Sequence, residues 1–277
     1  LGDEILVLNS GYNSYLRKLL PSEMNLNIIY EDSDLIVIDK DEGISVHPSP
    51  SDYRHSLVEG VLYHSKQLYS SEEASLRPGV VHRLDKDTTG LIVFAKTKLA
   101  FDSLTEQFKL KKNLRCYRAV LDGTLPKETV TYESFLKRSP IKRDRFESYV
   151  KTELSSKNLN DNSYRFARSH FFSLEVFGHQ FSYVKVKLDT GRTHQIRIHS
   201  KKLGCPILGD PIYNVKRDYS SFFDHQLRTV LKSLTTQLLH AEELGFFHPR
   251  TKKWLLFKVK PHENFNYVLQ LLQKYKN

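Results

Sequence analysis

Charged side chains crowd the start of an apolar stretch in residues 80–96, VVHRLDKDTTGLIVFAK. Within this stretch Asp85 has Arg83 and Lys86 as close neighbours. A nearby opposite charge favours the ionised form of a carboxyl group, and an ionised, oriented carboxylate can act as a nucleophile or a base. A solvated turn or a structural salt bridge would use the same residue types, so this segment alone leaves both interpretations open.

Metal, hydrolase and nucleotide chemistry find little support in the spacing of the motifs. Two sets of side chains could offer metal ligands, namely His82 with Asp85 and Asp87, and His194 with His199. Neither set has an HExxH or CxxC framework, and neighbouring Arg and Lys residues oppose a bound cation. The chain also has no G-x-S-x-G elbow, no phosphate-binding P-loop and no G-x-G-x-x-G motif.

The elements that must position these side chains follow from the apolar patterns. Residues 34–39, 91–95, 183–188 and 254–260 predict strands, and residues 154–163 predict an exposed hairpin loop or insertion. Helical spacing occurs in residues 56–68, 96–108, 192–204 and 264–276. Thr193 is the expected N-cap of the third helix, with Gly204 past its end. Without a regular βαβ rhythm, this mixture indicates an α+β fold around a largely antiparallel or mixed sheet.

The charge balance favours a polyanionic partner. The 277 residues contain 42 Lys+Arg and 32 Asp+Glu, a net charge of +10. Basic residues interleaved with aromatic ones cluster at 108–118, 136–145 and 248–254, which suits RNA, although a solvated surface would use the same residues. No apolar run could span a bilayer, no secretory signal is visible, and Cys116 and Cys205 are expected to be reduced thiols.

Five stretches resemble motifs of the RluA-type family of RNA pseudouridine synthases. HRLDKDTTG closely resembles the catalytic motif, with Thr89 where serine is frequent. Residues 35–50 are similar to the first motif, with Asp41 in place of a proline. Residues 114–123, 188–213 and 239–249 match the remaining motifs in the family's order. On these motifs, which span most of residues 27–260, the sequence is identified as a member of this family.

The resemblance implies a fold and a reaction. The expected fold is a bent, mostly antiparallel mixed sheet flanked by helices, with a central active-site cleft. The expected reaction is the isomerisation of uridine to pseudouridine in RNA, without a redox, metal or nucleotide cofactor. Asp85 maps to the catalytic aspartate, Tyr117 to the tyrosine that stacks on the base, and Arg197 to the arginine that pairs with the aspartate. Whether Asp85 attacks the ribose, attacks the base or abstracts a ribose proton stays open.

The target uridine must be flipped out of a paired stem to reach a buried carboxylate. By resemblance, Arg83 fills the vacated place and Ile198 packs beside the base. The remaining expected site residues are ones that shape the cleft: Lys40 contacting backbone or carboxylate, His82 in a structural hydrogen bond, Thr89 in the catalytic motif, and His194 and Gln195 beside Arg197.

The domain organisation and the substrate are expectations of the same kind. Residues 1–26 read as an N-terminal appendage, with a strand signal at 2–8 similar to the end of an S4-like RNA-binding domain, and residues 27–277 as the catalytic domain. The branch most like this chain favours large-subunit ribosomal RNA, while transfer RNA and a non-catalytic RNA-binding factor remain alternatives. We expect a cytoplasmic monomer that binds RNA and no membrane.

Overall fold

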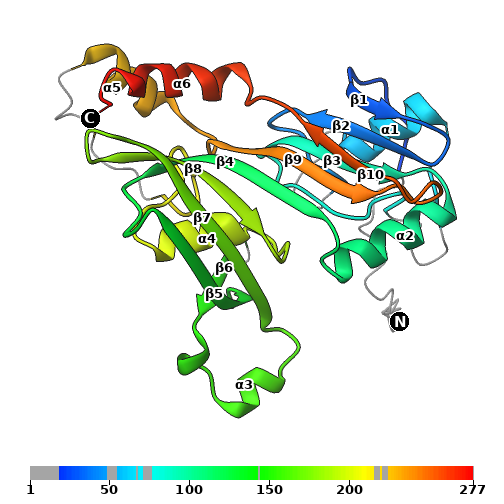
Figure 1. Cartoon of the computed structure of the whole chain (residues 1–277), viewed down its shortest axis with the longest axis horizontal. Helices are drawn as coiled ribbons and strands as arrows, with labels where there is room; N and C mark the ends of the chain where they lie inside the picture. The colour runs from blue at the N-terminus through cyan, green and yellow to red at the C-terminus, as the bar shows by residue number, and fades with distance from the viewer. Residues whose placement is uncertain are drawn as a thin grey trace, which may run out of the picture.

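The computed structural model describes residues 19–48, 55–66, 68–70, 77–142, 144–214, 219 and 224–276. The strand expected at residues 2–8 lies outside them. Ten strands of the described residues form one sheet (Figure 1). The strands are β1 (Asn27–Glu31), β2 (Leu35–Lys40), β3 (Thr89–Ala95), β4 (Leu114–Asp122), β5 (Thr129–Arg138), β6 (Phe146–Tyr149), β7 (Arg165–Phe177), β8 (Phe181–Leu188), β9 (Leu239–Phe247) and β10 (Trp254–Lys258).

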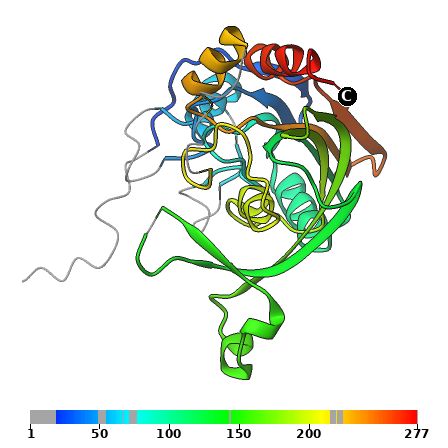
Figure 2. The same ribbon diagram turned by 90° about the vertical axis from the view of Figure 1, so that its left-hand side faces the viewer.

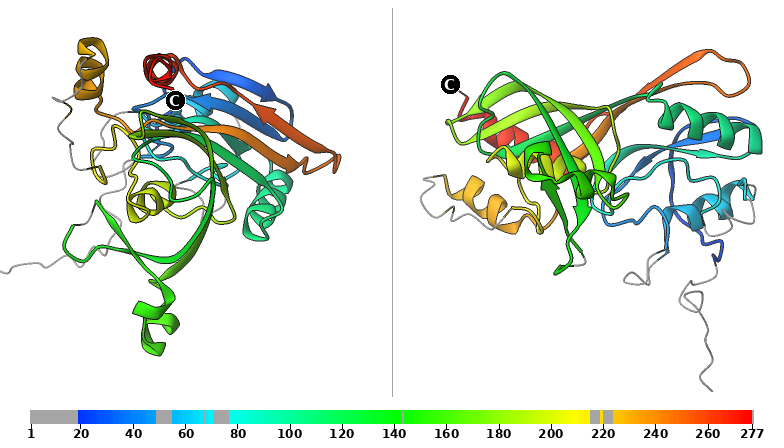
Figure 3. Two further views of the ribbon diagram at one scale, coloured as in Figure 1. Left: turned by 60° about the vertical axis from the view of Figure 1, so that its left-hand side comes forward. Right: turned by 90° about the horizontal axis from the view of Figure 1, so that it is seen from below.

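The order of the strands brings distant motifs to the centre of the sheet. Neighbouring strands run β1-β2-β3-β9-β4-β8-β7-β5-β6, and β10 also pairs with β9. Every pair is antiparallel except β3 and β9, which run parallel through Thr89–His240 and Gly90–Ala241. The expectation of a mostly antiparallel mixed sheet is therefore confirmed. In Figures 2 and 3 the half of the sheet containing β4, β8, β7 and β5 curves around helix α4.

Helices cover the sheet at several places. In the described residues they are α1 (Leu57–Ser65), α2 (Lys98–Lys109), α3 (Ser156–Asn160), α4 (Gln195–Lys202), α5 (His225–Ser233) and α6 (Glu263–Gln273), with a 3-10 turn at Lys151–Glu153. The expected loop at 154–163 contains the exposed α3. This helix lies beyond the ends of β5 and β7, where the two strands extend away from the rest of the sheet (Figure 1). No helix of the described residues is long and apolar enough to cross a membrane.

Strands β2 and β3 are buried on both faces, which explains their continuous apolar sequences. Ile36, Ile38 and Ile92 pack in one core with Leu57 of α1. The alternate residues of the same strands pack in a second core with Ala100 and Leu104 of α2. Because successive side chains of a strand point to opposite faces, two helices can hold these strands from both sides. The strands therefore provide a rigid base for the loop that precedes β3.

Residues 19–26 pack against this first core. Leu19, Met24 and Leu26 contact it as partly buried side chains. The backbone N–H of Leu20 donates to Glu59 Oε1 at 3.3 Å, and that of Ser22 donates to the Glu59 carbonyl at 3.2 Å. These contacts join the described end of the expected appendage to α1, so the packing shows no boundary at residue 26.

Candidate active site

Segments that lie far apart in the sequence line one small cavity beside the centre of the sheet. They are the loop before β3, strand β4, and the turn that leads into α4. The predicted residues among its lining are Arg83, Asp85, Tyr117, His194, Gln195 and Arg197. Lys40, His82, Thr89 and Ile198 are not in the lining, and each has contacts elsewhere.

An ionic chain crosses the cavity wall. Arg197 Nη1 donates to Asp85 Oδ2 at 3.1 Å, while Nε and Nη2 donate to the two oxygens of Asp210 at 2.7 and 2.9 Å. The side chain of Asp85 is 17% exposed, that of Arg197 5%, and that of Asp210 0%. Asp210 Oδ1 also accepts the backbone N–H groups of Ile212 and Tyr213 at 2.9 and 3.0 Å. Arg197 is thus fixed from behind and presents one N–H to Asp85.

The electrostatics of the cavity keep Asp85 ionised. Burial alone would raise the pKa of Asp85, but the positive charge that His194 carries when protonated, the charge of Arg197 and the Arg197 hydrogen bond outweigh burial and hold the pKa below its usual range. Burial lowers the pKa of His194, so this imidazole is neutral at pH 7. Burial raises the pKa of Tyr117 on β4, so the phenol keeps its proton. The site therefore presents one carboxylate beside a neutral aromatic ring.

The loop that carries Asp85 is held by hydrogen bonds from a buried lysine, Lys40. Lys40 Nζ donates to the carbonyls of Asp41, Ile44 and Lys86 at 2.7, 3.0 and 2.7 Å. The Lys86 carbonyl belongs to the residue directly after Asp85. Burial lowers the pKa of Lys40 to about 8. Lys40 thus ties the end of β2 to the Asp85 loop.

Two further contacts fix the ends of this loop. Thr89 Oγ1 lies 2.8 Å from His240 Nδ1 on β9, the strand that runs parallel to β3. His82 Nε2 accepts the backbone N–H of Val93 at 3.1 Å, and its ring stacks on Phe108 with centroids 4.6 Å apart. Burial, with the charge of Arg115, lowers the pKa of His82 to about 3. A permanently neutral imidazole suits this hydrogen-bonding contact.

The turn into α4 is braced by Gln195. Its Oε1 accepts from Thr190 Oγ1 at 2.8 Å and from the Arg192 backbone at 3.0 Å, and its Nε2 donates to the Arg168 carbonyl at 2.9 Å. The prediction of Thr193 as N-cap is wrong: His194 occupies that position, in the left-handed region with φ 56°. Its Nδ1 lies 2.9 Å from the Tyr213 hydroxyl, and this turn aims the imidazole at the cavity.

Ile198 does not lie where the resemblance puts it. It packs with Leu136, Ala167 and Tyr213 on the far side of α4, whereas Ile196 lines the Asp85 cavity. Residues two positions apart on a helix point roughly 200° apart, so only one of the two can face the cavity. Ile196 therefore replaces Ile198 as the apolar residue of this wall.

Two buried polar residues of the site were not among the predicted ones: Asp210, which lies behind Arg197, and Arg115, which lines the cavity. Asp210 lies within the matching motif at 188–213, but nothing in its spacing from Arg197 indicates that the two pair. Arg115 lines the cavity from β4, two residues before Tyr117. The alternation of strand side chains could have identified it, because residues i and i+2 of a strand share a face.

A larger cavity, of about 850 Å³, lies on the other side of the Asp85 loop. Its lining is acidic, with Asp39, Asp41, Glu42, Asp87 and Glu263. Acidic walls oppose a polyanion, and the cavity lacks the Asp85–Arg197 pair. The smaller arginine-lined cavity is therefore the better candidate for RNA chemistry, although it is not the largest.

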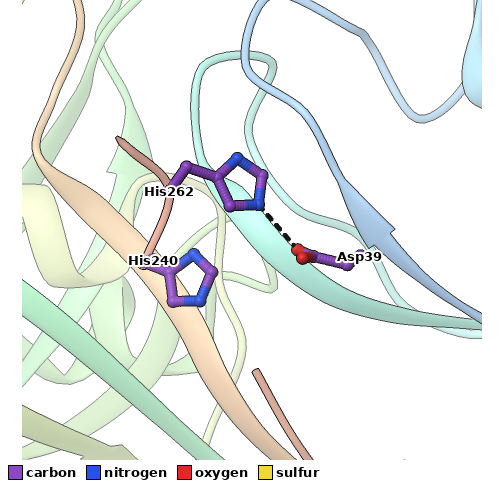
Figure 4. Close-up of side chains that lie close together, drawn as sticks. All are labelled: Asp39, His240 and His262. Carbon is purple, nitrogen blue, oxygen red and sulfur yellow. Dashed lines mark hydrogen bonds and ion pairs between the residues drawn. The ribbon is translucent and has the colours of Figure 1, made fainter. Parts of the chain in front are cut away.

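Two groups of side chains among the described residues could share a metal ion: Asp39, His240 and His262, and Asp32, Asp34 and His248. In the first, His262 Nε2 lies 2.9 Å from Asp39 Oδ1 (Figure 4). In the second, His248 Nε2 lies 2.8 Å from Asp32 Oδ2. These ion pairs account for the clustering, so we assign no metal to either group. Neither group coincides with the ligand sets considered from the sequence.

Comparison with known proteins identifies the class of enzyme. Residues 34–202 match the family model described as RNA pseudouridylate synthase. The chain belongs to this family and is an RNA pseudouridine synthase.

Individual relatives support the same assignment. An uncharacterized RNA pseudouridine synthase of Aquifex aeolicus is 36% identical over 92% of this chain and 75% of its own length. Ribosomal large subunit pseudouridine synthase D of Zymomonas mobilis is 34% identical over 91% of this chain and 74% of its own. The solved structure of human RNA pseudouridylate synthase domain containing 4 has a TM-score of 0.67 at 21% identity, covering 89% of this chain and 93% of that one. The last similarity concerns the fold alone.

Proposed function

We propose that this enzyme isomerises uridine in large-subunit ribosomal RNA, with Asp85 as the essential group. The observation that carries the proposal is the Asp85–Arg197–Asp210 chain in an arginine-lined cavity beside Tyr117. The choice of RNA rests on the relatives named ribosomal large subunit pseudouridine synthase D. The enzyme acts in the cytoplasm as a monomer without a cofactor.

The reaction exchanges one bond for another. The bond from C1′ of the ribose to N1 of uracil breaks, the base rotates, and C5 bonds to C1′; C5 then loses its proton and N1 gains one. An ionised carboxylate is needed whether Asp85 attacks the ribose, attacks the base or removes a ribose proton. Arg197 keeps Asp85 charged and oriented, and the protonated Tyr117 ring stacks on the base.

The substrate uridine reaches Asp85 by flipping out of its stack. Arg83, exposed at the rim, fills the place that the base leaves, and Ile196 supports the base from α4. His194 and Gln195 keep the turn before Arg197 in shape, while Lys40, His82 and Thr89 hold the Asp85 loop. The catalytic domain comprises residues 27–277, joined by the packed segment 19–26, with the preceding residues as an appendage.

Release of tritium from RNA labelled at uridine C5 tests the proposal, because the reaction removes the C5 hydrogen. We expect the wild type to release label from an unmodified large-subunit ribosomal RNA transcript with chelator present. Asp85→Asn keeps the size of the side chain but removes its charge, so release should fall roughly a thousandfold or more. Transfer RNA transcripts, assayed in parallel, test the alternative substrate.

Asp87→Asn is the matched control. Asp87 belongs to the same loop but lines the acidic cavity, away from Arg197. This variant should keep most of the activity. Equal losses in the two variants would contradict the assignment of Asp85, and binding of both RNAs without release by the wild type would favour a non-catalytic RNA-binding factor.

A further inference from the structure

Arg115 is a buried cation of the cavity, and no residue that the structure describes forms an ion pair with it. It lies on β4 with 8% of its surface exposed and shares the cavity with Asp85 and Tyr117. Within the described part of the chain its Nε has no hydrogen-bond partner, and Arg115 forms no ion pair. The acid whose charge acts on it, Asp189, is already engaged by Arg168 and His170 at 3.5 and 3.2 Å. A buried charge without a partner is costly, so such a group indicates a ligand of opposite charge.

The surroundings leave room for the guanidinium, but among the described residues no carboxylate forms an ion pair with it. Its central carbon lies 5.4 Å from the centroid of the Phe108 ring. A Cβ at Gly191 would come within 2.2 Å of Arg115 Nη1. Gly191 has no positive φ, so a side chain is excluded there by the space that the guanidinium needs. The neutral His82, stacked on the same Phe108, adds no counter-charge.

A second arginine strengthens the positive potential at this end of the cavity. Arg192 also lines the cavity, and its charge lowers the pKa of Arg115, as burial does. Arg192 Nε donates to the Phe166 carbonyl at 3.1 Å. Paired guanidinium groups present planar sets of N–H donors that match phosphate oxygens.

We propose that Arg115 and Arg192 form a subsite for a backbone phosphate of the RNA, the one adjoining the uridine held against Asp85. This inference rests on the proposed function. Arg115 and Asp85 line the same cavity as Tyr117, so the subsite and the reactive carboxylate share the space that would receive the base. A base on Tyr117 would leave its own backbone within reach of Arg115. The phosphate supplies the missing counter-charge and anchors the flipped nucleotide.

The first experiment measures the salt dependence of binding to a large-subunit ribosomal RNA transcript. Arg115→Met keeps the apolar stem and removes the charge; we expect binding to weaken about 10- to 100-fold. The slope of log Kd against log salt concentration should fall by about one, the amount for one phosphate contact. Arg115→Lys should restore the slope. Lys232→Met, an exposed charge on α5, is the control for net charge.

The second experiment locates the contact. Once the wild type has shown which uridine it modifies, that uridine is placed in a short RNA with a neutral methylphosphonate at its 5′ or 3′ linkage. One of these linkages should weaken wild-type binding about tenfold but leave Arg115→Met unaffected. Equal weakening of binding in the wild type and in Arg115→Met would overturn the proposed phosphate subsite. So would an Arg115→Met variant with the affinity and the salt slope of the wild type.

Two controls keep the outcomes separate. If Arg115→Met does not fold, Gly191→Ala tests the same contact, because its Cβ displaces Nη1, and it should also reduce affinity and slope. Binding measured in the Asp85→Asn background is independent of turnover. Absence of tritium release by the wild type refutes the proposed function, whereas an unchanged salt slope refutes the phosphate subsite.

Discussion

At the scale of the residue, the site depends on one guanidinium held between two carboxylates. Arg197 is bound in a bidentate manner by Asp210 and presents its remaining donor to Asp85. Together these effects raise the pKa of Arg197 above its usual range despite its burial. Of the two carboxylates, only Asp85 lines the cavity, because Asp210 is fully buried and turned toward backbone N–H groups.

Asp210→Asn should therefore impair catalysis although Asp210 does not line the cavity. Losing the buried charge removes a charge-assisted contact worth about 1.5–3 kcal/mol, and Arg197 is no longer held in one position. We expect kcat for tritium release to fall about 10- to 100-fold with little change in RNA affinity. Single-turnover release and filter binding measure the two quantities separately.

Asp122→Asn is the matched control for this variant. Asp122 is also a buried carboxylate, bonded to the Tyr219 hydroxyl at 2.8 Å, but it does not contact Arg197. It should cost stability and leave kcat near the wild-type value. A similar loss of kcat in both variants would show that general destabilisation, and not the position of Arg197, limits the rate.

The sequence could predict which motif residues meet, but not every contact between them. Asp85, Tyr117 and Arg197 share a cavity because their motifs occupy fixed places in a known family. That Ile196 and not Ile198 faces the cavity depends on how α4 is rotated about its axis. The left-handed backbone at His194 sets this rotation. The role of Asp210 depends on the turn at 210–213, whose backbone N–H groups bind its carboxylate. Neither feature has a signature in residue spacing.

At the scale of the element, the loop before β3 is positioned by the strands beside it. The short, continuous apolar runs of β2 and β3 were readable from the sequence and correctly predicted buried strands. That β9 lies parallel to β3, bringing His240 to Thr89, was not readable, because pairing across 151 residues depends on the whole sheet. Lys40, at the end of β2, holds the same loop through its hydrogen bond to the Lys86 carbonyl.

Lys40→Met tests how much the hydrogen bonds from Lys40 to the Asp85 loop contribute to stability and activity. It leaves the carbonyl groups of Asp41, Ile44 and Lys86 without their donor, so we expect a loss of stability of about 2–4 kcal/mol and at least tenfold lower activity. In the wild type the pKa of Lys40 is about 8, and a neutral amine has only two N–H groups for three acceptors. Activity should therefore decline above about pH 8 in the wild type.

The matched measurement is the pH profile of tritium release in both proteins. The folded Lys40→Met variant should lack the decline near pH 8, since it has no titrating group at that position. Lys232→Met, with an exposed charge removed from α5, should retain the wild-type profile. An alkaline decline that persists in Lys40→Met would assign it to another group.

At the scale of the whole molecule, charge is divided between the two sides of the Asp85 loop. One side carries Arg83, Arg115, Arg192 and Arg197, and the other an acidic cavity. The net charge of +10 attracts RNA in general, while this division favours its approach from the arginine side. The sequence predicted the overall attraction from composition alone. The division could not be predicted without the fold, because the acidic residues come from β2, the turn that follows it, the loop before β3 and α6.

Buried neutral histidines should make the whole molecule less stable in acid. Burial lowers the pKa of His82 to about 3 and those of His199 and His240 to about 4. In the unfolded chain each imidazole titrates near pH 6.5, so below that pH the unfolded state binds more protons than the folded state. The unfolding free energy should therefore fall as the pH drops from 7 to 5, by roughly 2 kcal/mol for each histidine.

His199→Gln isolates one of these contributions. His199 on α4 lies 3.0 Å from Ser134 Oγ and 2.9 Å from Ser169 Oγ, contacts that an amide can replace in part. The variant should be less stable at pH 7, but the difference in urea midpoint between pH 7 and pH 5 should shrink. His225→Gln, at an exposed position on α5, should show the full wild-type difference. If His199→Gln keeps that difference too, the loss of stability between pH 7 and pH 5 arises from other titrating groups and not from His199.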